Sequence, residues 1–78
     1  EKGLEVYPNP THNIVLINYP EIIQSLVVVN VSGQELINKP RVVSKHVEID
    51  LTGMPDGIYI VRINDGRDIV PLKIIKAE

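Results

Sequence analysis

Three side chains that could take part in nucleophilic catalysis alternate along one short stretch of the 78-residue sequence. On a β-strand Ser44, His46 and Glu48 would point the same way, and a hydroxyl, an imidazole and a carboxylate are the groups of a hydrolytic triad. Alternate strand residues are, however, about 6.6 Å apart, beyond the hydrogen-bond reach of a nucleophile and its base. The spacing therefore favours a solvated strand face, and we expect no enzyme.

Metal and cofactor sites have little support in the sequence. The two histidines, His12 and His46, have no ligand-spaced companion, and Cys is absent, whereas a metal site needs three or four converging ligands. The Asp-Gly pairs at 56–57 and 65–66 lack the alternating carboxylates of a calcium loop, and Asp-Gly is ordinary hairpin chemistry. The glycines are scattered beside turns rather than gathered in a phosphate loop. We expect no cofactor and no metal.

The composition points to a small β-domain. The chain contains 12 Ile, 11 Val and 6 Leu but a single Ala, and β-branched residues suit a pleated surface better than a helix. A net charge of −2 gives nucleic acid no electrostatic reason to bind. No apolar run approaches the length of about 20 residues that a transmembrane helix needs. The only aromatic residues are three tyrosines, which is few for a sugar-binding platform.

Seven short apolar segments, separated by turn residues about every ten positions, predict seven strands. The expected strands are residues 4–7, 13–19, 25–31, 35–38, 46–51, 58–63 and 69–75. This pattern predicts an all-β fold, a small antiparallel immunoglobulin-like β-sandwich of about seven short strands. Pro20 should end the second strand, with at most one helical turn at 22–24.

Side-chain patterns predict where several segments lie in the sandwich. Segments 14–17 and 26–29 are apolar on both faces and should be central or covered strands. Tyr59 shares a strand face with Val61 and Ile63 and is expected in the core, whereas Tyr7 should pack at a strand end. Lys73 and Lys76 bracket the last apolar residues, which fits either an edge strand kept soluble by lysines or a terminal strand offered to a receptor.

Four segments together resemble a known family. They are Val6-Tyr7-Pro8-Asn9-Pro10 with the strand that follows, residues 29–36 around Gly33, residues 49–61 with the Pro-x-Gly-x-Tyr pattern at 55–59, and Lys73-Ile74-Ile75-Lys76. In order and spacing they resemble the C-terminal sorting domain of the type IX secretion (Por) system of Bacteroidota. Met54 stands where that family usually has Leu, and two residues follow the final Lys.

The resemblance implies a non-catalytic secretion signal. Such a domain would direct an N-terminal cargo protein through the periplasm and the outer-membrane translocon to the cell surface or the medium. A sortase-like peptidase would then remove it, or it would serve in surface anchoring. The sorting-motif residues that the resemblance implies are Pro8, Asn9, Pro10, Gly33, Gly57, Tyr59, Lys73 and Lys76.

The organisation that we expect is one domain, residues 1–78 with a core at about 4–76, excised from a longer secreted protein, because the chain begins with Glu1 and its only Met is Met54. Exposed strand edges would also allow a dimer through the edge strand. The alternative function is an immunoglobulin-like accessory or adhesion module of a secreted glycan-active or protease-type protein.

Overall fold

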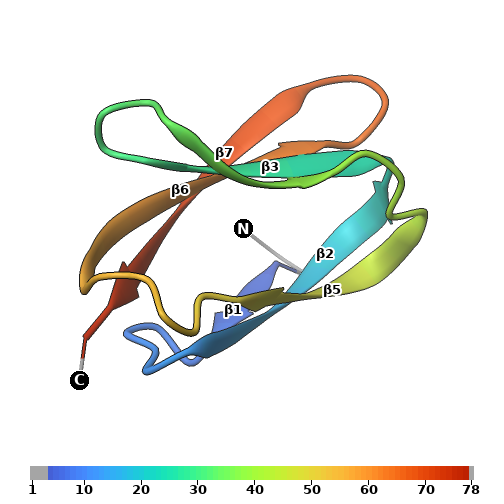
Figure 1. Ribbon diagram of the computed structural model, residues 1–78. Helices are drawn as coiled ribbons and strands as arrows, with labels where there is room; N and C mark the ends of the chain where they lie inside the picture. The colour runs from blue at the N-terminus through green and yellow to red at the C-terminus, as the bar shows by residue number, and fades with distance from the viewer. Residues whose placement is uncertain (1–3, 78) are drawn as a thin grey trace.

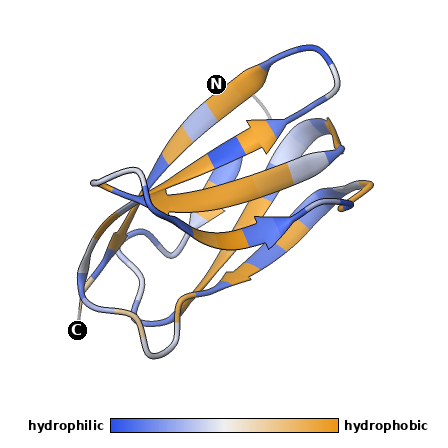
Figure 2. Cartoon of the chain, turned by 45° about the horizontal axis from the view of Figure 1, so that its top comes forward, coloured by the Kyte–Doolittle hydropathy of each residue, from blue (hydrophilic) through white to orange (hydrophobic). Residues whose placement is uncertain are grey.

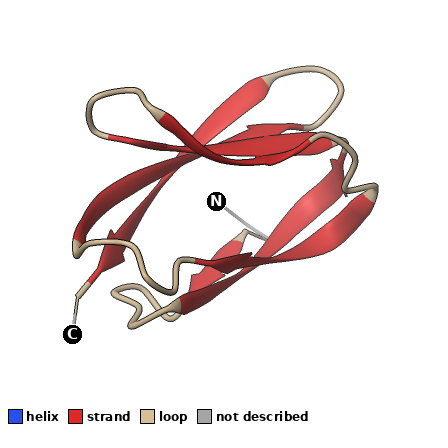
Figure 3. Ribbon diagram, viewed as in Figure 1, coloured by secondary structure: helices blue, strands red, loops and turns tan. Residues whose placement is uncertain are grey.

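The computed structural model describes residues 4–77, and the regular elements in this range are all strands (Figure 3). Seven strands pair antiparallel in two sheets that face each other (Figure 1). The strands are β1 (Glu5–Tyr7), β2 (Ile14–Ile23), β3 (Ser25–Asn30), β4 (Glu35–Lys39), β5 (Ser44–Asp50), β6 (Gly57–Asn64) and β7 (Ile69–Lys76). This confirms the predicted small β-sandwich. Within the described range there is no helix that could cross a membrane.

The two sheets differ in size. The smaller has the order β1-β2-β5 and the larger the order β4-β3-β6-β7. Segments 14–17 and 26–29, which are apolar on both faces, belong to β2 and β3, and both strands are flanked on two sides. The prediction that these segments are central is therefore confirmed. The last strand, β7, lies at an edge of the larger sheet.

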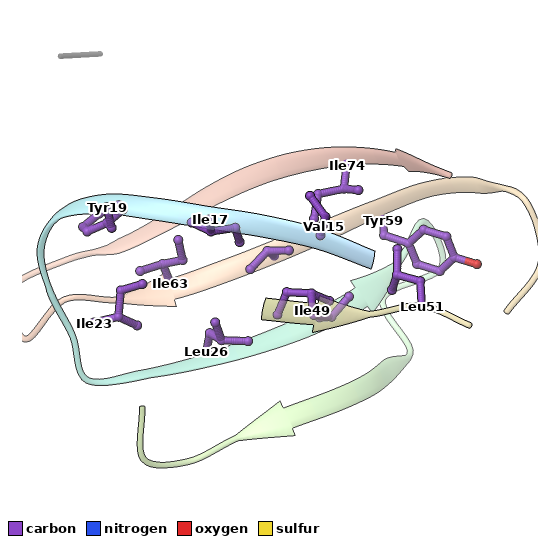
Figure 4. Packing of buried hydrophobic residues seen from close by; sticks show 12 residues of the cluster. Val15, Ile17, Tyr19, Ile23, Leu26, Ile49, Leu51, Tyr59, Ile63 and Ile74 are labelled. Carbon is purple, nitrogen blue, oxygen red and sulfur yellow. The ribbon is translucent and has the colours of Figure 1, made fainter. Parts of the chain in front are cut away.

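The core lies between the sheets and is built from alternate residues of the strands (Figures 2 and 4). On β5, Ile49 is fully buried while His46 and Glu48 are exposed. On β6, Tyr59 is only 4% exposed, as its strand pattern predicted. The buried cluster consists of Val15, Ile17, Tyr19, Ile23, Leu26, Val28, Ile49, Leu51, Tyr59, Val61, Ile63 and Ile74.

The prediction that Pro20 ends the second strand is wrong, because β2 continues to Ile23. Regular pairing with β5 stops at Asn18 and resumes only at Ile23, with an irregular register between them. The pairing of β2 with β1 likewise reaches no further than Asn18. Pro20 therefore lies where β2 lacks regular ladder partners, so its missing N–H costs no ladder bond. The helical turn considered at 22–24 is also wrong, since two of these residues belong to the strand.

Candidate recognition site at the end of the C-terminal strand

The Pro8-Asn9-Pro10 turn lies against the outer edge of β7. The Asn9 side chain donates from Nδ2 to the carbonyl oxygen of Lys73 at 3.1 Å and accepts, through Oδ1, the N–H of Ile75 at 2.9 Å. An amide side chain has the same donor and acceptor as a peptide group. Asn9 thus takes the place of one peptide of a neighbouring strand.

Thr11 continues this contact along β7. Its N–H donates to the carbonyl oxygen of Ile75 at 2.8 Å, and its own carbonyl oxygen accepts the N–H of Ala77 at 2.9 Å. These bonds form an isolated parallel bridge between Thr11 and Lys76. Thr11 is 2% exposed, and its hydroxyl donates to the carbonyl oxygen of Ile14 at 2.6 Å. Proline offers no N–H, so Asn9 and Thr11 supply all the donors that this turn directs at β7.

The predicted lysines have different environments. Lys73 is exposed, as a lysine that keeps an edge strand soluble should be. Lys76 is 4% exposed, and its Nζ lies 3.6 Å from Oδ1 of Asp56. The idea that Lys76 also keeps the strand soluble is therefore wrong, because its side chain points to the core side of β7, where Asp56 pairs with it.

The turn that carries Asp56 is held by its neighbours in the Pro-x-Gly-x-Tyr pattern. The Tyr59 hydroxyl donates to the carbonyl oxygen of Pro55, which joins the turn to the core. Gly57 has φ +152°, a conformation that side-chain-bearing residues rarely adopt. An added Cβ there would meet no atom within 4 Å, so the requirement for glycine comes from the backbone and not from space.

The β3–β4 turn lies beside this segment. Asn30 Oδ1 accepts the N–H groups of Ser32 and Gln34, and Gly33 has φ +86°. Residues of both turns line a surface hollow of about 340 Å³, among them Asn30, Gln34 and Pro55. All four segments on which the resemblance rests therefore meet at one end of the sandwich, on the left in Figure 1.

The possible catalytic residues do not assemble into a site. The His46 Nδ1 lies 2.6 Å from Oδ1 of Asn18, and the backbone N–H of His46 donates to Oγ of Ser44 at 3.0 Å. Glu48 is exposed on the same strand, and His12 is exposed in the turn before β2. Within residues 4–77, no three metal-ligating side chains gather in one place.

In the two turns that could suggest calcium, protein groups contact the aspartate carboxylates. Asp65 accepts the N–H groups of Asp68 and Arg67 at 2.8 and 3.0 Å, which lowers the pKa of its carboxyl group. The Tyr19 hydroxyl donates to the other carboxylate oxygen at 3.1 Å. In the 55–57 turn the Asp56 carboxylate faces Lys76. Both carboxylates therefore have protein partners that stabilise the turns.

Sequence reasoning missed Thr11, whose contacts are as extensive as those of Asn9. A single Thr after a proline carries no pattern that would have singled it out. Sequence reasoning also missed that the Tyr7 side chain is exposed. It is 45% exposed, and its hydroxyl oxygen accepts a hydrogen bond from Asn18 Nδ2 at 3.2 Å. Tyr7 was expected to pack at a strand end.

Comparison with known proteins identifies the family. Residues 5–77 match the family described as the secretion system C-terminal sorting domain. A curated relative, Beta-agarase A of Zobellia galactanivorans, is 36% identical over 61 residues, which are 76% of this chain and 11% of that protein. The chain thus spans about a tenth of the length of this relative. It belongs to the secretion system C-terminal sorting domain family, whose members are sorting signals for export by the type IX secretion system to the cell surface or the extracellular space.

Proposed function

We propose that this domain carries a protein fused to its N-terminal side through the periplasm and across the outer membrane. The partners in this proposal are the outer-membrane translocon, which recognises the domain, and a sortase-like peptidase, which removes it or attaches the cargo to the surface. Residues 1–78 would act as one sorting unit with no catalytic role. The observation that carries the proposal is the family match over residues 5–77.

The geometry at one end of the sandwich supports a role for the sorting-motif residues. Asn9 binds β7 directly, and Lys76 reaches Asp56 beside Gly57. Motif residues far apart in the sequence thereby gather at one end of the sandwich, which suits recognition of a folded domain better than recognition of a linear tag. Pro8, Pro10, Gly33 and Tyr59 shape the turns or the core around it.

A fusion secretion assay tests the proposal. Residues 1–78 are attached to the C-terminus of a fluorescent protein that carries an inner-membrane signal peptide. The fusion is expressed in a bacterium with a working type IX system and in a translocon-null strain. We expect reporter at the cell surface or in the medium of the competent strain alone. A reporter without the domain is the matched control.

A second fusion lacks residues 72–78 and should accumulate in the periplasm, because the end of β7 and its contacts with Asn9 and Thr11 are lost. Normal secretion of this truncated fusion would contradict the proposal. So would an intact, folded domain that leaves the reporter in the periplasm of both strains, even behind a longer linker. That result would favour an accessory module instead.

A further inference from the structure

The hydrogen bonds of Asn9 and Thr11 fix which backbone groups of β7 face outward. The carbonyl oxygen of Lys73 and both backbone groups of Ile75 bind the turn, so odd-numbered residues of β7 direct N–H and C=O away from β6. Backbone groups alternate along an antiparallel strand. The even-numbered residues Val70 and Leu72 therefore direct theirs to β6, where they pair with Ile63 and Val61.

The outer edge of β7 is consequently divided into two halves. Residues 9–11 occupy the half from the carbonyl oxygen of Lys73 to the N–H of Ala77. The other half presents the N–H of Lys73, the carbonyl oxygen of Pro71 and both backbone groups of Ile69. Among residues 4–77 no strand pairs with β7 on this side, because the sheet order ends at β7. Pro71 removes one donor from the open row, which proline does at strand edges.

The side chains beside the open half define the partner that would fit. Val70 and Leu72 pack against the core but remain partly exposed on this edge. On the opposite face Ile69 is 60% exposed and Lys73 is exposed. An added strand would cover the two core-side residues with apolar side chains and meet Lys73 with an acidic or polar one. Strand addition of this kind obtains affinity from the backbone and specificity from alternate side chains.

We propose that the open half of the β7 edge, from Ile69 to the N–H of Lys73, binds an extended segment of a protein of the secretion machinery. The segment continues the row of hydrogen bonds that Asn9 and Thr11 begin. This inference rests on the proposed function, and it narrows the recognised edge to the part that the N-terminal turn leaves free.

Proline substitution at Lys73 tests the proposal. Lys73→Pro removes an N–H that faces the open edge and leaves the even-numbered bonds to β6 in place, as Pro71 already does. We expect the purified variant to melt like the wild type and the reporter fusion to lose export. Lys73→Arg is the matched control and should be exported, because it keeps both the backbone N–H and the positive charge.

Ile69→Pro gives the same test at the other end of the open half, should Lys73→Pro fail to fold. Leu72→Pro checks the alternation, because its N–H faces β6 and its loss should lower the melting temperature. Export of the wild-type fusion tests the proposed sorting function separately. The sorting function and the binding of a strand at the β7 edge can therefore be refuted independently.

Three results would overturn the inference. The first is a folded proline variant, at Lys73 or Ile69, that is exported like the wild type. The second is loss of export in Lys73→Arg, since this variant keeps the N–H and the charge, and recognition would then depend on the lysine side chain itself and not on the strand edge. The third is a purified wild-type dimer in sedimentation velocity that Lys73→Pro dissociates, since the edge would then bind a second copy of the chain.

Discussion

Replacing Asn9 with Ala tests whether one amide side chain holds the N-terminal turn to the C-terminal strand. The change removes the bonds to Lys73 and Ile75 and leaves the Thr11 backbone bonds in place. A hydrogen bond contributes about 0.5–1.5 kcal/mol net to the free energy of unfolding. Because Asn9 is exposed and water can replace it, we expect a loss of about 1–2 kcal/mol in total.

This loss is large enough to measure and small enough to leave the domain folded. A chain of this length has a free energy of unfolding of about 4–12 kcal/mol at the usual stability per residue. In a domain of this size each kcal/mol shifts the melting temperature by about 4–8 °C, so Asn9→Ala should melt about 5–15 °C lower. Thermal unfolding followed by circular dichroism measures this shift.

A local measurement separates this contact from general destabilisation. The Ile75 amide should exchange its hydrogen faster in Asn9→Ala, while the Ala77 amide, bound to Thr11, should change less. Asn38→Ala is the matched control, because the Asn38 side chain donates to the exposed Glu35 carboxylate and the loss of this bond should cost less than about 0.5 kcal/mol. A melting temperature within about 2 °C of the wild type, with unchanged Ile75 exchange, would refute the reasoning.

Three further predictions concern the turns and the ion pair between the buried Lys76 and the exposed Asp56. Gly57→Val should lower the free energy of unfolding by about 1–3 kcal/mol, because a β-branched residue resists φ +152°. Gly57→Ala is the milder control. An unchanged melting curve for Gly57→Val would count against this prediction. Lys76→Met should change the free energy of unfolding, measured by chemical denaturation, by no more than about 1 kcal/mol, because an apolar side chain replaces a buried charge. A loss of several kcal/mol would contradict this, since it would mean that the ion pair with Asp56 strongly stabilises the domain. The pKa of Asp65 and of Asp50 is lowered in the folded state, for Asp50 by hydrogen bonds from Thr52, so both favour folding above the ordinary aspartate pKa of about 3.9. This contribution to the free energy of unfolding should disappear as the pH falls through the lowered folded-state pKa values. In a plot of melting temperature against pH, the double variant Asp50→Asn, Asp65→Asn should therefore lose less melting temperature at acid pH than the wild type does.

Local sequence predicted the elements well where the pattern was strict. The alternation around Ile49 and around Tyr59 identified strands and their buried faces, because period-two hydrophobicity reflects a half-buried sheet directly. Gly33 and Gly57 marked turns that do adopt positive φ. The continuation of β2 through Pro20 could not be predicted from the sequence. A proline fits there because neither β1 nor β5 pairs regularly with β2 beyond Asn18, and this pairing depends on segments distant in the sequence.

The candidate site depended on the tertiary structure for a different reason. The sequence contained Asn9, Lys73 and Lys76 as separate motif residues, and nothing local relates an asparagine to a strand 64 residues later. Only the packing of the two sheets brings the first turn to the edge of the last strand, buries Lys76 beside Asp56 and leaves Ile69 open. Strand propensity and turn chemistry are local and can be read in order along the chain, whereas edges and their partners arise from contacts between distant segments.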